Sequence, residues 1–282
     1  MSLAAAPAAH SATEPPLVFD GPLLLAGIGD GPSLAAHRQR YGELPRLDAS
    51  SLLAAVGPID LRGRGGAGFP FAVKLKAALD EGHRWTRREI VVNVAEGEPA
   101  SAKDAALALT VPHRILDGAV IAAHALQVRT IHLVVPSERP LVQRAMETAV
   151  RERISFGERI TWKIHEADPT FVAGQARAVV QLIEGQPNLP VTSWAPEAIS
   201  GVKGRPTLLS NAETWAHVFA VAVLGEGRYA GVGLADEPGS SLLTITRSAA
   251  SAPFDVRSTQ VREVPYGTAW DAVLTREELA RP

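Results

Sequence analysis

The segment EIVVNV, residues 89–94, decides the fold class. It is a short, continuous run of apolar and β-branched residues, which is typical of a strand buried on both faces of a parallel sheet. Residues 112–128 follow with a helical pattern, and Pro112 suits the first turn of that helix. The run TIHLVV at 130–135 repeats the apolar strand pattern. A strand, a helix and a second strand in this order predict an α/β fold in which helices cover a sheet.

The alternation of helices and strands continues in both directions from this unit. The further predicted elements are helices at 52–56 and 69–79, a helix at 137–153, a strand at 159–167, and helices at 173–184 and 211–224. A proline-rich loop at 185–206 separates the last two helices. From residue 240 the pattern changes to two short strands, SLLTITR and REVPYGT, and one helical turn, AWDAVL.

These patterns divide the chain into three predicted parts. Residues 1–49 form an N-terminal extension, and the Ala- and Pro-rich residues 1–15 at its start are predicted to be disordered. Residues 50–235 form the α/β domain, and residues 240–282 begin a second, smaller domain.

Composition excludes several classes of function. The chain has 28 basic and 30 acidic residues, a formal net charge of −2 and no cysteine. The balanced charge argues against nucleic acid as a partner. The absence of cysteine excludes a disulfide framework and any cysteine-ligated zinc or iron–sulfur site within this chain. Residues 1–16 lack the features of a signal peptide, and the apolar run 218–224 is too short to span a bilayer. We therefore expect a cytoplasmic protein without direct membrane insertion.

The segment GRGGAGF, residues 63–69, contains four glycines and raises the question of what approaches its backbone so closely. Gly63, Gly65 and Gly68 match the dinucleotide pattern G-x-G-x-x-G. The preceding segment is helical rather than a strand, which disfavours an ordinary NAD-binding site. The remaining interpretation is a glycine loop beside a helix N-terminus that holds a phosphate. Further positive charge is supplied by Arg62, Arg64 and Lys74.

A second polar segment, NVAEGEP at 93–99, directly follows the central strand. It places Asn93, Glu96 and Glu98 at the carboxyl end of that strand, where ligands bind in open α/β sheets. The eight histidines show no metal-binding spacing, so no metal site is expected. The segment HEAD at 165–168 is interpreted as a solvated turn, and no G-x-S-x-G nucleophile motif is present.

Four motifs in order resemble the flavin-binding subunit of NADH:quinone oxidoreductase (respiratory complex I) and its relatives in hydrogenases and formate dehydrogenases. They are LRGRGGAGFP, NVAEGEP, FVAGQARAVVQLIEG and GRPTLLSNAETWAHV, within about residues 50–225. The region from 240 resembles the start of the β-grasp (SLBB) module that follows in that family. The resemblance implies a Rossmann-like FMN-binding domain followed by the beginning of a small β-grasp domain.

The resemblance also implies site residues and partners. FMN, rather than FAD, would be bound by Gly63, Arg64, Gly65, Gly66, Lys74, Asn93, Glu96, Gly174, Ser210, Asn211 and Thr214. NADH would contact Phe69 and Glu98. No side chain is assigned as a catalytic acid, base or nucleophile, because the cofactor carries the hydride chemistry. Electrons would pass to iron–sulfur centres of a partner, either a ferredoxin-like protein or an iron–sulfur subunit, or to a soluble acceptor.

Departures from the family pattern keep a second interpretation open. The family aspartate is Ala95, its two glutamates before a helix are Gln175 and Ala176, and an aromatic residue is Ala77. Trp194 stands near the place of a later phenylalanine. Each lost hydrogen bond costs about 1 kcal/mol, so two or three losses would weaken NADH binding roughly ten- to a hundredfold or more. The alternatives are therefore an FMN-dependent oxidoreductase subunit and a non-catalytic flavin-binding or assembly module.

Overall fold

The computed structural model describes residues 15–80, 87–246 and 259–274, so the tail predicted at the N-terminus lies almost entirely outside the described residues. In chain order the elements are β1 (Leu17–Val18), the 3-10 turn η1 (Ile28–Asp30), α1 (Leu34–Tyr41), α2 (Ala49–Val56), α3 (Phe71–Asp80), β2 (Glu89–Asn93), α4 (Lys103–Thr110), α5 (Pro112–Leu126), β3 (Thr130–Pro136), α6 (Pro140–Ser155), β4 (Thr161–Ala167), η2 (Phe171–Gly174), α7 (Ala176–Ile183), η3 (Val202–Gly204), β5 (Thr207–Asn211), α8 (Ala212–Leu224), α9 (Glu226–Ala230), β6 (Ser240–Thr246), β7 (Thr259–Pro265) and α10 (Trp270–Val273).

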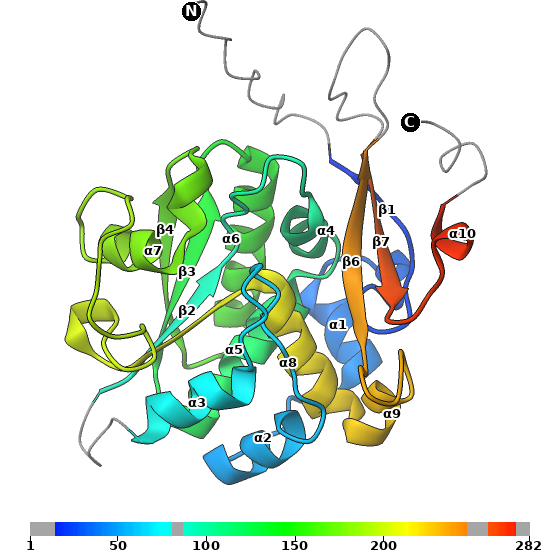
Figure 1. Cartoon of the computed structure of the whole chain (residues 1–282), viewed down its shortest axis with the longest axis horizontal. Coiled ribbons are helices and arrows are strands. Elements are labelled where there is room, and N and C mark those ends of the chain that lie inside the picture. The colour runs from blue at the N-terminus through cyan, green and yellow to red at the C-terminus, as the bar shows by residue number, and fades with distance from the viewer. Residues whose placement is uncertain (1–14, 81–86, 247–258, 275–282) are drawn as a thin grey trace, which may run out of the picture.

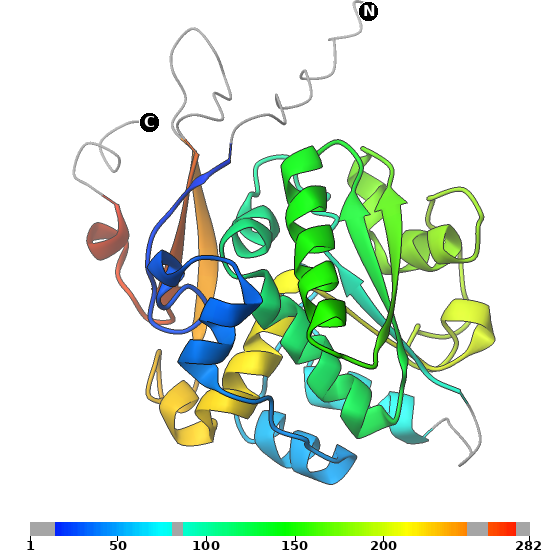
Figure 2. The same ribbon diagram turned by 180° about the vertical axis from the view of Figure 1, so that it is seen from behind.

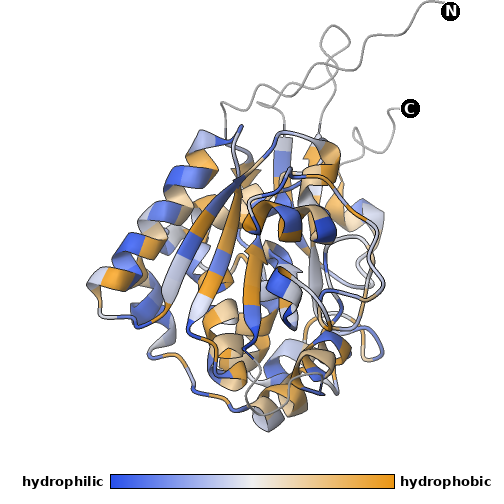
Figure 3. Ribbon diagram, turned by 90° about the vertical axis from the view of Figure 1, so that its left-hand side faces the viewer, coloured by the Kyte–Doolittle hydropathy of each residue, from blue (hydrophilic) through white to orange (hydrophobic). Residues whose placement is uncertain are grey.

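A four-stranded parallel sheet in the order β4-β3-β2-β5 forms the centre of the protein. Every residue of β2 is buried, as its continuous apolar sequence predicts, whereas the edge strand β4 is largely exposed. Figure 3 shows the apolar colour concentrated on the inner strands. The predicted α/β fold class is therefore confirmed.

Helices cover both faces of the parallel sheet (Figures 1 and 2). The main core includes residues of α5, α8 and the sheet face toward them, and a smaller core lies under α7. At Gly118 in α5 an added Cβ atom would lie 1.9 Å from the carbonyl oxygen of Trp215 in α8. The glycine is thus what lets these two helices approach. In the described part of the chain no single helix is long and apolar enough to cross a membrane, although α4 and α5, joined at a 94° bend, satisfy length and composition together.

The sequence patterns missed two elements near the sheet. Strand β5 is five residues long and α8 begins at the next residue, so its apolar run merges with the helical pattern. Helix α4 is eight residues long, and its N-cap residue Ala102 carries no side chain that can cap it. The local sequence therefore contains too short an apolar run to predict β5 and no capping residue to predict α4. The HEAD segment, expected as a turn, instead lies largely within β4.

A second sheet has three strands in the order β1-β7-β6. Strands β6 and β7, which pair antiparallel, correspond to the two short strands predicted after residue 240, and α10 corresponds to the predicted helical turn. Strand β1, close to the start of the described chain, pairs in parallel with β7. The two ends of the described chain therefore meet in this sheet, as Figure 1 shows. The predicted division at residues 50, 235 and 240 remains a prediction.

A clamp holds the segment that follows β1, residues 23–26. The Glu263 carboxylate in β7 accepts hydrogen bonds from the backbone N–H groups of Leu23, Leu24 and Leu25. On the other side, the Arg114 guanidinium of α5 donates to the backbone carbonyls of Leu23, Leu24 and Ala26. Both polar edges of this buried backbone are satisfied by side chains from other elements. The clamp therefore fastens the second sheet to the α/β layer.

Candidate functional site

The candidate site lies at the carboxyl ends of β2 and β5. The chain proceeds from β2 to β3 on one side of β2, whereas β5 lies on its other side. Such a reversal of strand order opens a crevice at the carboxyl ends of the adjacent strands, where ligands bind in open α/β sheets. The last residues of the two strands, Asn93 and Asn211, are paired in register at this point. We refer to this place as the crevice.

Asn211 has one buried polar atom available to a ligand. It caps α8, because its Oδ1 accepts a hydrogen bond of 3.3 Å from the Thr214 backbone N–H. Its Nδ2 is buried and has no hydrogen-bond partner among the described residues. A buried donor without a partner is costly, so it points to a partner supplied from outside the chain.

The glycine loop lies over the start of α8, between α2 and α3 (Figure 1). Its neck is closed by the Gly63 N–H, which donates to the Phe69 carbonyl over 2.9 Å. The Arg64 N–H donates to Thr214 Oγ1 over 2.8 Å. Thr214 also donates from its hydroxyl to Asn211, and its side chain is fully buried. Thr214 therefore positions the glycine loop on the helix.

The glycines in the middle of the loop face open space. An added Cβ atom at Gly65 would meet no atom within 4 Å. At Gly66 φ is +96°, a backbone conformation that strongly favours glycine. No packing within the described chain demands the absence of a side chain at Gly65. Close approach of a ligand to this backbone is the physical reason that remains.

The side chains of Arg64, within the glycine loop, and of Lys74, in the helix that follows it, point in different directions. The Arg64 guanidinium lies 5.0 Å from the ring centroid of Tyr266 beyond β7, a cation–π contact that ties the loop to the second sheet. The Lys74 ammonium of α3 donates to the Leu209 carbonyl in β5 over 3.1 Å. Burial lowers the pKa of Lys74, an effect that Glu197 partly opposes. Lys74 therefore places a partly buried cation beside β5, near the crevice.

The chain after β2 forms the opposite wall of the crevice. Asn93 Nδ2 donates to the Gly174 carbonyl over 2.8 Å, and Asn93 Oδ1 accepts from the Ala95 N–H. An added Cβ at Gly174 would lie 2.6 Å from the Ala95 carbonyl oxygen, and one at Gly97 would lie 2.4 Å from the Phe171 carbonyl oxygen. Both glycines are required for this contact. We refer to residues 95–97 and 171–174 together as the wall.

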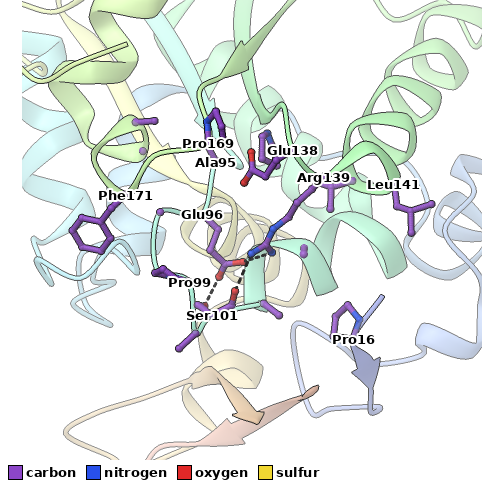
Figure 4. Close-up of a pocket in the computed structure, with 18 of the residues that line it drawn as sticks. Pro16, Ala95, Glu96, Pro99, Ser101, Glu138, Arg139, Leu141, Pro169 and Phe171 are labelled. Atoms are coloured by element: carbon purple, nitrogen blue, oxygen red, sulfur yellow. Dashed lines mark hydrogen bonds and ion pairs between the residues drawn. The ribbon is translucent and has the colours of Figure 1, made fainter. Parts of the chain in front are cut away.

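Glu96, expected at the flavin, has its carboxylate on the far side of the wall. It accepts hydrogen bonds from the Ser101 hydroxyl and from the N–H groups of Lys103 and Asp104, at the first turn of α4. Arg139 at the start of α6 donates to it over 3.4 Å (Figure 4). Burial raises the pKa of Glu96 to about 6, and the Asp104 carboxylate adds to the shift. Glu96 thus supplies the cap that Ala102 cannot.

Three other predicted site residues lie around the crevice, and their polar contacts do not indicate a role in binding. Phe69 is 46% exposed at the neck of the glycine loop. Glu98 is exposed, and its carboxylate accepts a hydrogen bond of 3.3 Å from the Ala100 N–H. Ser210 is buried in β5, and its carbonyl accepts from Trp215 Nε1.

Sequence reasoning missed a buried ionic cluster beneath the wall. The Lys103 ammonium lies 3.0 Å from carboxylate oxygens of both Asp104 and Glu213. Burial alone would lower the pKa of Lys103, but the carboxylates of Asp104, Glu213 and Glu96 raise it above its usual range. Lys103 and Glu213 are 110 positions apart, so no local sequence pattern predicts their ion pair. In the described ranges no group of three or more His, Asp or Glu side chains is arranged to hold a metal.

The residues at the crevice fit a flavin mononucleotide. The exposed loop backbone at Gly65, the free Asn211 Nδ2 and the Lys74 ammonium would suit a ring and a phosphate. Two of the predicted contacts are less direct, because the Arg64 side chain contacts Tyr266 and the Glu96 carboxylate faces α4.

Comparison with known proteins identifies the same region. The family model described as the Nuo51 FMN-binding domain matches residues 56–220. One relative, a subunit of the NADH-quinone oxidoreductase of Buchnera aphidicola subsp. Acyrthosiphon pisum (strain APS), is 26% identical over 76% of this chain and 49% of its own length. Another, NADP-reducing hydrogenase subunit HndC of Solidesulfovibrio fructosivorans, is 29% identical over 76% of this chain and 44% of its own length.

A solved structure agrees with these matches. The crystal structure of NAD⁺-reducing [NiFe]-hydrogenase in the air-oxidized state superposes with a TM-score of 0.78 at 30% sequence identity, over 95% of this chain and 44% of that chain. The chain therefore spans about half the length of the proteins that it matches. The match of the family model to more than half of the residues shows that the chain belongs to the family of the FMN-binding domain of the 51-kDa flavin subunit.

Proposed function

We propose that this chain is the FMN-binding module of a nicotinamide-dependent oxidoreductase, which accepts a hydride from NADH or a related donor. The observation that carries the proposal is the buried Asn211 Nδ2, a donor without a partner among the described residues, at the topological switch point of the sheet. The open space at Gly65 and the Lys74 ammonium lie around the same crevice. Bound FMN would supply the two-electron chemistry, and the protein would position it.

Each residue around the crevice has a definite part in the proposal. Asn211 donates to the flavin mononucleotide, and the backbone at Gly63, Gly65 and Gly66 accommodates its close approach. Asn93 holds Gly174 and the wall in place. Phe69 and Glu98, both accessible at the entrance, are assigned to the nicotinamide donor. Thr214 and the Arg64 backbone fix the loop on α8.

The donor is expected to bind weakly. Gln175, where the family has a glutamate, is exposed at the N-cap of α7, and its side chain makes no capping hydrogen bond. Ala176 and Ala95 likewise offer no polar group to a ribose or a nicotinamide amide. These replacements favour the alternative function, a flavin-binding or assembly module that no longer oxidises NADH.

Electrons need an exit outside this chain. The sequence contains no cysteine, so no cysteine-ligated cluster is held here. We propose an iron–sulfur subunit or a ferredoxin-like protein as the acceptor. One similar protein is named as a hydrogenase subunit and another as a quinone oxidoreductase subunit. Location in the cytoplasm stays a prediction.

The test is a fluorescence titration of the purified protein with FMN, followed by anaerobic stopped-flow mixing with NADH. We expect the fluorescence of FMN to be quenched at a ratio of one FMN per chain. We also expect NADH to bleach the flavin absorbance slowly, at a rate that saturates only weakly with NADH concentration. FMN binding without any bleach would favour the non-catalytic module. No FMN binding, or preferential binding of FAD, would contradict the proposal.

A further inference from the structure

A cavity lies behind the wall, on the side away from the crevice. It is partly open to solvent, has a volume of about 250 Å³, and lies between the loop after β2, the start of α6 and the loop after β4. Its lining is mostly apolar and includes Ala105. Figure 4 shows Pro16, Leu141 and Pro169 around it. Prolines and alanines offer rigid, shallow walls, and the volume suits a ligand of one or two rings.

The cavity is separate from the flavin crevice. The wall residues Gly97 and Gly174 line it, while their close contacts with Phe171 and Ala95 leave no passage for a side chain between the two segments. The Glu96 side chain lies on the cavity side of the wall, and the Phe171 ring points away from the cavity in Figure 4. None of the glycine-loop residues, Asn211 or Thr214 lines the cavity.

Arg139 lines the cavity with a guanidinium whose hydrogen-bond donors are only partly satisfied. Its guanidinium donates to Glu96 and to the Ser101 carbonyl, each over 3.4 Å, which is longer than the usual 2.7–3.2 Å. Its Nε–H and one N–H on each terminal nitrogen have no partner among the described residues. The side chain is 19% exposed, so these donors remain accessible. A planar guanidinium with free donors matches a carboxylate.

The start of α6 adds to this preference for an anion. Arg139 is the N-cap residue, its side chain does not cap the helix, and Pro140 occupies the first position. The next two residues, Leu141 and Val142, line the cavity. The 16-residue helix directs the positive end of its dipole toward the same place.

Three carboxylates also border the cavity, and their charges must be weighed against Arg139. Glu96 is buried and already accepts from Ser101 and from the first turn of α4. Glu138 and Asp168 are exposed, so water screens them. Among the residues that line the cavity, Arg139 supplies the cation that an anionic ligand can contact.

We propose that this cavity binds a small planar organic acid, with its rings against Leu141 and Pro169 and its carboxylate on Arg139. The proposal does not rest on FMN binding, because the lining residues do not include the glycine loop or Asn211. The wall is shared, so an occupant would contact the backbone that also faces the crevice.

The test is calorimetric titration of the FMN-free protein with 2-naphthoate and with its uncharged analogue 2-naphthalenemethanol. We expect a Kd below about 1 mM for 2-naphthoate and at least about tenfold weaker binding of the alcohol, since one charge-assisted interaction is lost. Arg139→Gln should abolish the preference for the acid. Ala105→Leu should weaken both ligands by filling space. Arg144→Gln, an exposed arginine on the same helix, is the matched control.

Several results would overturn the proposal. One is equal binding of acid and alcohol, and another is binding that neither Arg139→Gln nor Ala105→Leu changes. Absence of saturable binding to the folded wild type, with circular dichroism confirming the fold, would also do so. Competitive displacement of 2-naphthoate by FMN would place the acid in the crevice instead. FMN binding that persists without any 2-naphthoate binding would reject the cavity and leave the proposed function standing.

Discussion

The two sides of the loop after β2 differ in how completely their polar groups are satisfied. On the α4 side, the Glu96 carboxylate has four donors from its own chain. On the crevice side, Asn211 keeps a buried Nδ2 without a partner in the described residues, and Gly65 faces empty space. The Glu96 carboxylate is satisfied by the chain itself, whereas the crevice has a buried donor whose partner a ligand can supply.

The difference also sorts residues that look alike in the sequence. Asn93 and Glu96 belong to one short polar motif after one strand. Asn93 braces the wall of the crevice, whereas Glu96 caps a helix behind it. Substitutions at the crevice and at Glu96 should therefore change different properties: FMN binding at the crevice and folding stability at Glu96.

Gly65→Val should have the largest effect, on the crevice side. An added Cβ atom meets no atom within 4 Å, so the fold should persist, but the valine side chain would occupy the space proposed for FMN. We expect FMN affinity to fall at least about a hundredfold, roughly 2.7 kcal/mol. Fluorescence titration measures the affinity, and Gly29→Val, an equally open glycine in η1, is the control. Wild-type affinity in Gly65→Val would mean that the flavin binds elsewhere.

Asn211→Asp tests the unsatisfied donor itself. Aspartate keeps the oxygen that caps α8 but removes Nδ2, and it adds a negative charge near the proposed phosphate. FMN should bind about ten- to a hundredfold more weakly, since a hydrogen bond to a charged group contributes roughly 1.5–3 kcal/mol. The thermal midpoint should stay near that of the wild type. Unchanged FMN affinity would show that Asn211 Nδ2 does not contact FMN.

Glu96→Gln tests the satisfied carboxylate through pH. The pKa of Glu96 is raised to about 6 in the folded protein, from an ordinary value of 4.5, so its stabilising contribution is present below about pH 4.5 and is lost as pH rises through 6. Linkage makes this loss about 2 kcal/mol. The stability of the wild type relative to Glu96→Gln should fall by that amount between about pH 4.5 and 7.5.

Urea unfolding at several pH values measures this difference directly. Histidines such as His113, whose pKa burial lowers to about 4, contribute with the opposite sign in the same range, but they cancel in the comparison of the two proteins. Glu98→Gln, on the exposed part of the same loop, is the control. A difference that grows with pH would show that Arg139 and the α4 N–H groups hold the carboxylate in its charged form.

Gln175→Glu combined with Ala176→Glu should have the smallest effect. The two positions begin α7, where negative charge is favoured, and they restore the family carboxylates beside the crevice. We expect about fivefold faster reduction of bound FMN by NADH, corresponding to roughly 1 kcal/mol. Stopped-flow absorbance gives the rate, with Gln181→Glu at the other end of the helix as control. Fast reduction by the wild type, or no gain in the variant, would show that these carboxylates are not what limits the reaction.

Local patterns predicted most of the fold, because the inner strands and long helices carry strong periodicity. Strand β2 and helix α5 begin at or next to their expected positions. Helix α4 escaped prediction because its cap comes from Glu96, seven residues before its first residue. Strand β5 escaped because α8 follows it without a turn. Both depend on context that a window of sequence does not contain.

The site was predicted in part for the same reason. The motifs identified both edges of the crevice, and the register of β2 with β5 brings Asn93 beside Asn211. The direction of the Glu96 side chain depends on Arg139, 43 positions away, and that of Arg64 depends on Tyr266. Tertiary partners at such separations decide which polar residues remain available to a ligand.

The clamp on residues 23–26 has a consequence for the order of folding during synthesis. Its acceptor, Glu263, lies 240 positions after Leu23, so this contact closes one of the longest loops in the described chain. A ribosome releases the N-terminal residues first, and non-local contacts form late. The parallel sheet can therefore assemble before Glu263 emerges, while residues 23–26 wait for their partner. In pulse-labelled hydrogen exchange during refolding, the amides of Leu23, Leu24 and Leu25 should gain protection after those of β2 and β3.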